Sequence, residues 1–261
     1  VYGVLDRLTA RPPAEDLAAA PHLLYGHVHP SVAHSTGAWL DDVRRLIEEG
    51  TFHDRPAIFV GGTGLYFEAL TRGLSEMPAV PEEVRARWRA RLAAEGAPAL
   101  HQILLRDDPE TAARLHRSDG QRIVRALEVL EASGRPIAHW QSVRAAPMVD
   151  ATSARHFVID PDRTQLSARI DFRLQEMAQS GALAEVEAMM ALGLDPALPA
   201  MKAIGLREFQ QHLAGETPLI TAIERASAAT RQYAKRQTTW MRNRFDARWR
   251  RVSDAGAITS V

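Results

Sequence analysis

An α/β fold is predicted by the run Ala57-Ile58-Phe59-Val60-Gly61-Gly62-Thr63-Gly64-Leu65. Its first four residues are apolar and predict a buried strand, and the apolar residues 65–70 predict a helix that follows at once. The glycine turn between them would lie at the carboxyl edge of a sheet, where ligands bind in open α/β folds. Thr63 offers a hydroxyl there, and the glycines let the chain pass close to a ligand. Such turns are also common without a ligand, and no Gly-Lys-Ser/Thr follows to make this one a phosphate-binding P-loop.

The regions around this run differ in their expected secondary structure. Strands are expected at residues 23–28, 156–159 and 249–252, and a helix at residues 35–49. Between Pro78 and Ser142 nearly every segment predicts a helix, with helices expected at residues 81–95, 98–106, 109–116 and 119–133. Further long helices follow from Asp162, with breaks near Gly181, Gly193 and Gly215. We therefore expect an α/β core with a parallel sheet, built from residues 1–75 and 150–261, and an all-helical insertion domain of residues 76–149.

Composition narrows the class of protein. The chain has 261 residues, an apolar content of 46% and no net charge, enough for one large domain or two smaller ones. It contains no cysteine, which excludes disulfides, thiolate nucleophiles and cysteine-bound zinc and fits the cytoplasm. No apolar run approaches the roughly 20 residues that cross a bilayer, so we expect no membrane partner.

The strongest local charge lies near the end of the chain. On a helix, Arg231, Lys235, Thr238 and Arg242 fall on one stripe, with aromatic residues on the opposite side. Residues 231–251 contain eight basic side chains and one acidic side chain. Such a helix could hold a phosphate backbone while its aromatic face packs into a core, or it could simply be solvated.

A second candidate group lies within residues 119–128. Asp119 can cap a helix on which Gln121 and Arg125 share a face, while apolar neighbours point inward. Arg122 and Arg125 could contact phosphates or stack on unpaired bases, or they could pair with Glu128 or Glu131.

Two smaller groups have structural alternatives as well. Arg169 and Arg173 lie one helical turn apart and could clamp an anion, or they could pair with Asp171 and Glu176. The histidines at positions 22, 27, 29 and 34 are close in sequence, but their spacing suits no metal site well, and we expect them to be structural.

In order and spacing, several motifs resemble the tRNA dimethylallyltransferase family, also called tRNA isopentenyltransferases. The resemblance spans essentially the whole chain and is carried by Val1-Tyr2-Gly3, Thr9-Ala10-Arg11-Pro12, Pro21-His22 and the segments 59–66, 121–128, 134–136, 204–208 and 230–240. The family transfers a dimethylallyl group from its diphosphate to the exocyclic amine of the adenine 3′-adjacent to the anticodon in tRNA. The resemblance implies a P-loop NTPase-like core whose helical insertion grips the anticodon loop.

The resemblance also implies roles for particular residues. Thr63 and Arg173 would be catalytic, and the diphosphate substrate would contact Gly61, Gly62, Thr63, Arg173 and, more weakly, Arg169. The tRNA would contact Thr63, Arg85, Gln121, Arg122, Ile123, Val124, Arg125, Lys202, Ala203, Ile204, Gly205, Leu206, Arg207, Arg231, Gln232, Lys235, Arg236 and Gln237. A monomer acting on tRNA and dimethylallyl diphosphate in the cytoplasm is expected.

The sequence departs from the family pattern at its start. The family opens with a P-loop that holds the diphosphate and Mg²⁺, and continues to an Asp-Ser pair whose aspartate is the general base. Val1 follows directly after the place expected for that pair, so we hypothesise that the sequence covers part of a longer protein and that the Mg²⁺ ligands precede Val1.

Two alternatives remain open at this point. The first is a kinase or isopentenyltransferase acting on free nucleotides, which would leave the helical insertion and the basic helix without a task. The second is a catalytically silent RNA-binding protein.

Overall fold

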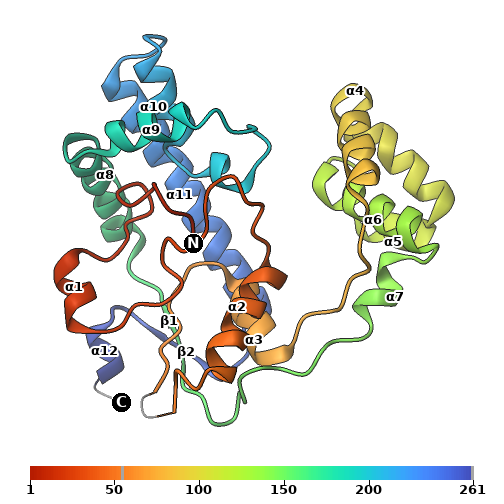
Figure 1. Cartoon of the computed structure of the whole chain (residues 1–261), viewed down its shortest axis with the longest axis horizontal. Helices are drawn as coiled ribbons and strands as arrows, with labels where there is room; N and C mark the ends of the chain where they lie inside the picture. Colours follow the sequence, from red (N-terminus) through yellow and green to blue (C-terminus); the bar gives the residue numbers. More distant parts are fainter. Residues whose placement is uncertain (54–55, 260–261) are drawn as a thin grey trace. The chain divides into compact units, whose positions relative to one another are not determined.

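The computed structural model describes residues 1–53 and 56–259, which form two compact units. The first unit comprises Val1–Phe67 and Ala151–Val261, and the second comprises Glu68–Asp150. Figure 1 shows the elements of both units along the chain. Of the helices in the described residues, none has the length and apolar character needed to cross a membrane.

The first unit contains a small parallel sheet and most of the helices. Strand β1 (His156–Ile159) pairs with β2 (Trp249–Val252) in register, His156 opposite Trp249 and Ile159 opposite Val252. Both strands have the bounds that were predicted from the sequence. The helices of this unit are α1 (Ala14–Ala19), α2 (Thr36–Glu48), the start of α3 (Gly64–Arg72), α8 (Arg163–Gln179), α9 (Ala182–Ala191), η1 (Pro199–Lys202), α10 (Leu206–Leu213), α11 (Leu219–Arg244) and α12 (Gly256–Thr259).

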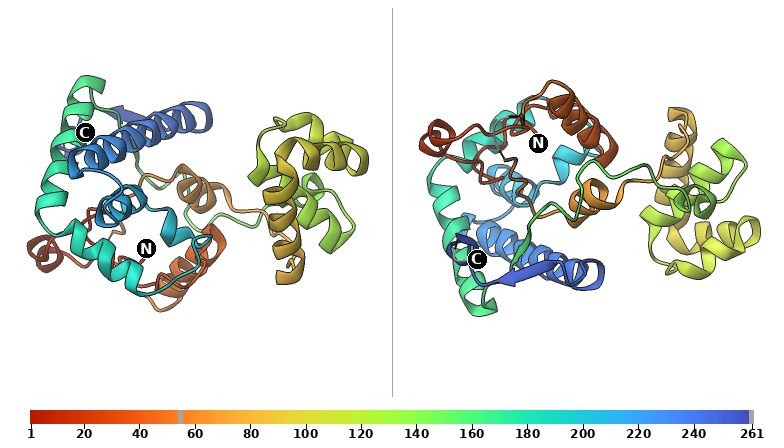
Figure 2. Two further views of the ribbon diagram at one scale, coloured as in Figure 1. Left: turned by 90° about the horizontal axis from the view of Figure 1, so that it is seen from above. Right: turned by 90° about the horizontal axis from the view of Figure 1, so that it is seen from below.

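The hydrophobic core of the first unit lies among its later helices. Phe209 of α10 is fully buried and packs with apolar side chains of α8, α9 and the first half of α11. The views from above and below show α8 and α10 beside α11 (Figure 2). The carboxylate of Asp162 caps α8, where it accepts hydrogen bonds from the backbone N–H groups of Thr164 and Gln165. The fully buried residues of α11 all lie in its first half, which anchors the helix in the core. The basic residues of its second half are more accessible to solvent.

The second unit is a helical bundle. It contains the end of α3 and the helices α4 (Glu82–Asp107), α5 (Pro109–Arg114), α6 (Gly120–Ser133) and α7 (Ile137–Gln141). Its core gathers Trp88 and Leu100 of α4 with Ile123 and Leu127 of α6. The two helices predicted at residues 81–95 and 98–106 form one element, interrupted at Gly96, whose φ of 79° lies in the left-handed region that favours glycine.

Two predicted strands are wrong. Residues 23–28 form a loop with one isolated bridge from Val28 to Tyr2, because Leu24 and Gly26 adopt left-handed φ values of 61° and 62° that interrupt an extended strand. Residues 57–60 are also irregular, and Ile58 and Val60 are 84% and 76% exposed. A strand needs a hydrogen-bonded neighbour, and within the described residues the sheet consists of β1 and β2, so this segment has no ladder partner.

The fold class itself is confirmed as α/β. The parallel pairing of β1 and β2, and the purely helical content of α4 to α7 between residues 82 and 141, match the expectation from sequence. Residues of helices, rather than of a large sheet, form most of both hydrophobic core clusters.

Candidate active site and RNA-binding surface

The glycine turn is seated against the basic helix α11. The carbonyl oxygen of Gly62 accepts a hydrogen bond of 2.8 Å from Nε2 of Gln237, which lies 175 residues further along the chain. A Cβ atom at Gly62 would overlap the Gln237 amide, and one at Gly64 would overlap the Trp240 ring. The glycines are therefore required for close packing on α11, whether or not a ligand also approaches them.

Thr63 lies at the exposed tip of this turn. Its side chain is accessible, and its carbonyl oxygen accepts the N–H of Tyr66 at 3.0 Å as α3 begins. Burial raises the pKa of Tyr66, with smaller contributions from Tyr2 and Tyr233. The Tyr66 phenol is therefore uncharged at neutral pH. Thr63 can therefore offer its hydroxyl to a ligand from a turn whose backbone is held by hydrogen bonds, at Gly62 to Gln237 and at Thr63 to Tyr66.

Aromatic side chains hold α3, α11 and β2 together behind the turn. Phe245 and Trp249 are stacked, with ring centroids 3.7 Å apart, and Trp240 meets Phe245 edge to face at 5.4 Å. Phe67 of α3 contacts the rings of both Phe245 and Trp249. The sequence indicated Trp240 but not its partners, because their meeting depends on the chain reversal between α11 and β2.

The candidate anion-binding arginines lie on α8, beside α11. Asp171, which lies between Arg169 and Arg173, pairs with Arg231 of α11. Arg173 is exposed and has no ion pair within the described part of the chain, so its guanidinium is available to an anion. Asp171 therefore forms its ion pair with α11 and not with the two candidate arginines of α8.

Arg169 has an acidic neighbour. The pKa of Asp254 is lowered because the hydroxyl of Ser253 and the N–H of Ala257 donate to its carboxylate, and the positive charge of Arg169 lowers it further. Because this carboxylate partly compensates Arg169, Arg173 is the better candidate for a diphosphate.

The segment Lys202 to Arg207 surrounds one cavity of the first unit. This cavity, of about 680 Å³, is lined by Lys202, Ala203, Ile204 and Arg207 together with residues of α9 and α11. Lys202 and Arg207 are exposed and place positive charge at it, whereas Gly205 and Leu206 are buried in the core. A side-chain contact of Leu206 with tRNA is therefore incompatible with its packing.

The other candidate group of the sequence lies in the second unit. Gln121, Arg122 and Arg125 line a cavity of about 340 Å³ together with the capping residue Asp119. Arg122 pairs with Asp119 at 2.8 Å, and Arg125 lies 3.5 Å from the buried Glu128. The pairing predicted from the sequence is thus confirmed for Arg125 with Glu128, whereas Arg122 pairs with the capping residue Asp119.

Three further residues that were predicted to contact tRNA differ in the burial of their side chains. Ile123 and Val124 are buried in the bundle, so their side chains cannot reach RNA while α6 is packed. Arg85 of α4 is half-buried and lies 3.8 Å from Glu82.

The remaining predicted tRNA contacts lie on α11. Gln232, Lys235 and Arg236 are exposed, and Arg236 lies over the ring of Tyr233 at 5.6 Å. Gln237 is partly buried by its bond to Gly62. The helix therefore carries both the RNA-binding candidates and the residue that holds the glycine turn.

Within the described residues, no group of three or more carboxylates lies close enough together to hold the expected Mg²⁺. Mg²⁺ prefers oxygen ligands, often carboxylates. Among the described residues, the one group that could hold a metal is His27, His34 and Asp42, in which two of three donors are imidazole nitrogens. We therefore derive no catalytic step through Mg²⁺.

Comparisons with known proteins support the resemblance. A tRNA dimethylallyltransferase of Mesorhizobium japonicum is 57% identical over 251 residues, covering 96% of this chain and 78% of the relative. A tRNA dimethylallyltransferase of Chelativorans is 58% identical over 249 residues, covering 95% of this chain and 85% of the relative.

A solved structure extends the comparison to the fold. The crystal structure of a tRNA isopentenylpyrophosphate transferase from Bacillus halodurans matches with a TM-score of 0.63 and 30% identity, covering 97% of this chain and 78% of that one. The family described as IPP transferase matches residues 1–244. With the glycine turn, the basic helix and the helical insertion all inside that match, the chain belongs to the IPP transferase family.

Proposed function

We propose that this chain is a tRNA prenyltransferase that transfers a dimethylallyl group from dimethylallyl diphosphate to the exocyclic amine of the adenine 3′-adjacent to the anticodon. The observation that carries the proposal is the hydrogen bond between Gly62 and Gln237, because it joins the turn that presents Thr63 to the helix that presents Lys235 and Arg236. On this proposal, the turn that contacts the substrate and the helix that binds RNA would form one surface. The names of the relatives, tRNA dimethylallyltransferases, agree with this reaction.

The chemistry requires one bond to break and one to form. The C–O bond of dimethylallyl diphosphate breaks, the amine nitrogen bonds to the same carbon, and the amine proton leaves to a base. Negative charge develops on the departing diphosphate, and a preorganised cation stabilises it. We assign that role to Arg173, assisted by Arg169, and assign Thr63 with Gly61 and Gly62 to the substrate contact.

The adenine must leave its stack before it reacts. Unstacking costs a few kcal/mol, which contacts to the rest of the tRNA must offset. We assign these contacts to the exposed side chains Gln232, Lys235 and Arg236 of α11, to Arg231, which is partly buried and paired with Asp171, and to Lys202 and Arg207 beside their cavity. In the second unit, Arg85, Gln121, Arg122 and Arg125 would hold the anticodon loop. The enzyme would act as a monomer in the cytoplasm, with Mg²⁺ as a cofactor whose ligands lie outside the groups described above.

The assignment of Arg173 separates catalysis from binding and is tested by Arg173→Ala. Prenyl transfer from dimethylallyl diphosphate to tRNA should fall by about 10²-fold or more, as for other losses of a transition-state charge contact. The affinity for tRNA, measured by gel shift, should change little. Arg169→Ala, one turn away on α8, is the matched control and should lose less activity.

Two outcomes would contradict the assignment. Equal losses of transfer and of tRNA affinity in Arg173→Ala would make this arginine an RNA contact. Transfer to free adenine nucleotide at a rate similar to that for tRNA would favour an enzyme acting on free nucleotides.

A further inference from the structure

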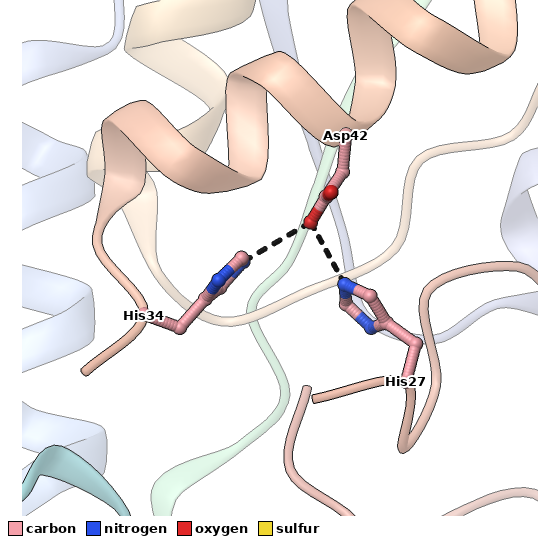
Figure 3. Close-up of side chains that lie close together, drawn as sticks. All are labelled: His27, His34 and Asp42. Atoms are coloured by element: carbon pink, nitrogen blue, oxygen red, sulfur yellow. Dashed lines mark hydrogen bonds and ion pairs between the residues drawn. The ribbon is translucent and has the colours of Figure 1, made fainter. Parts of the chain in front are cut away.

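A cluster of two histidines and one aspartate contains none of the residues assigned to the proposed active site. Nε2 of His27 is 2.8 Å from Oδ2 of Asp42, and Nε2 of His34 is 3.2 Å from the same oxygen (Figure 3). One donor atom from each residue lies within 4.8 Å of the other two. We propose that His27, His34 and Asp42 bind a divalent transition-metal ion of the Zn²⁺ type.

The three side chains are held in place by the fold. Asp42 lies on α2, and its second oxygen, Oδ1, is bound by Arg45 at 2.5 Å, which leaves Oδ2 for the histidines. His34 directly precedes Ser35, which caps α2, and the N–H of His34 donates to the hydroxyl of Tyr2 at 3.1 Å. His27 precedes Val28, whose backbone bonds to Val1 and Gly3. This supporting layer is what a metal site needs in order to orient its ligands.

His34 gives an independent indication of a missing partner. Its side chain is 8% exposed, and its Nε2 is buried without a hydrogen bond, although it points toward Asp42. A buried polar nitrogen without a partner is unfavourable. A metal ion between the three donors would accept the lone pair of this nitrogen.

A hydrogen-bonded His-Asp-His network is the simpler alternative. It accounts for the contact of His27 with Asp42, which meets the criteria of a hydrogen bond. It does not account for His34, whose Nε2 lies near the same oxygen without bonding to it.

The donor atoms indicate the class of ion. Two imidazole nitrogens and one carboxylate oxygen suit Zn²⁺, Co²⁺ or Ni²⁺, whereas Mg²⁺ and Ca²⁺ prefer oxygen ligands throughout. Three protein ligands leave at least one position for water. Bound metal would join the irregular segment of residues 21–34 to α2, and so stabilise the part of the first unit that contacts Tyr2.

The test is a titration of chelator-treated, tag-free protein with Co²⁺, followed by its visible absorption, and with Zn²⁺, followed by calorimetry. We expect one ion per chain, no competition from Mg²⁺, and a rise in Tm with Zn²⁺. His27→Ala and Asp42→Asn should each weaken binding by at least about 10-fold, as is typical for metal-site substitutions. Asp42→Asn preserves the shape of the side chain but removes its charge and one of its two acceptor oxygens, so it tests whether the ion is bound by the carboxylate.

His29→Ala is the matched control. His29 lies two residues from His27 in the same loop, is exposed, and bonds to the hydroxyl of Ser31 at 2.6 Å. Binding in this variant should equal that of the wild type. If the wild type binds no more tightly than His27→Ala, or if His29→Ala weakens binding as much as His27→Ala, the site does not exist. Neither titration contains tRNA or dimethylallyl diphosphate, so failure here leaves the proposed prenyl transfer unaffected.

Discussion

Helix α11 and the arginine-rich helices α4 and α6 carry the same kind of charge but differ in its compensation. In the second unit, Arg91 bonds to Glu95 at 2.6 Å, Arg122 pairs with Asp119, the cap of α6, and Arg125 lies near Glu128 of α6. On α11, Lys235 and Arg242 are exposed and have no ion pair within residues 1–53 and 56–259. A phosphate that binds to α11 can therefore pair directly with Lys235 or Arg242. A phosphate that binds to α6 must compete with a carboxylate for the arginine.

This difference assigns separate tasks to the two regions. Uncompensated charges give long-range attraction and a strong dependence on salt. Arginines paired at a surface are held in position, and each such pair contributes about 0–1 kcal/mol to stability. We infer that α11 supplies most of the affinity for tRNA, and that α6 supplies contacts of defined geometry.

The largest expected effect concerns the boundary between core and surface on α6. Ile123 is fully buried next to the exposed Arg122. Ile123→Ala should lower the free energy of unfolding by about 2–5 kcal/mol, through lost apolar contacts and a residual cavity. Hydrogen exchange should increase in α4 and α6. Val143→Ala, at a 69% exposed position of the same unit, should change stability little. Unchanged protection in α6 would contradict the placement of Ile123 in the core.

The next effect concerns the contact between the glycine turn and α11. In Gly64→Ala, the new methyl group must displace the ring of Trp240, and overpacking of this kind costs about 1–3 kcal/mol. Prenyl transfer should fall together with Tm, because Thr63 moves with the turn. Gly37→Ala in α2 meets only the Ser35 hydroxyl at 3.6 Å, so it should be neutral or stabilising. A Gly64→Ala enzyme with wild-type Tm and activity would show that the turn does not depend on α11.

A smaller effect compares the two kinds of cation directly. Lys235→Ala should reduce the slope of log affinity against log salt by about 0.7 to 0.9, the loss of one phosphate contact. Arg122→Ala should reduce it less, because Asp119 already holds that guanidinium at 2.8 Å. The measurement is tRNA binding over a range of salt concentrations. Equal slopes for the two variants would remove the distinction between free and paired cations.

Sequence alone located the elements whose signals are local. Asp119 and Ser35 begin α6 and α2 as capping residues should, and the strands at residues 156–159 and 249–252 are confirmed. The prediction of a strand at residues 57–60 is wrong. It rested on apolar character, which does not show whether a neighbouring strand is present for backbone hydrogen bonds. Left-handed φ at Leu24 is equally invisible to hydrophobic patterning.

The candidate site was predictable in its parts but not in its assembly. Its glycine turn and basic helix are visible as motifs, whereas the bond between Gly62 and Gln237 joins residues 175 positions apart. The sequence offers Asp171 as a partner for Arg169 and Arg173 on the same helix. Because α8 packs on α11, Asp171 forms its ion pair with Arg231 instead. Asp42 completes the histidine cluster from a separate helix, so histidine spacing alone could not indicate it.

The smallest expected effect concerns a paired arginine of the second unit. The hydrogen bond from Arg91 lowers the pKa of Glu95 below its usual value of 4.5. A carboxylate with a lowered pKa contributes stability that is present above its unfolded-state pKa and is lost as pH falls through the folded-state value. Arg91→Ala should therefore be slightly less stable than the wild type at pH 7, and the difference should shrink as pH falls through the lowered folded-state pKa of Glu95. Thermal unfolding from pH 7 to pH 3 measures this. A difference that stays constant from pH 7 to pH 3 would mean that Arg91 acts through its contact with the Trp88 ring rather than through Glu95.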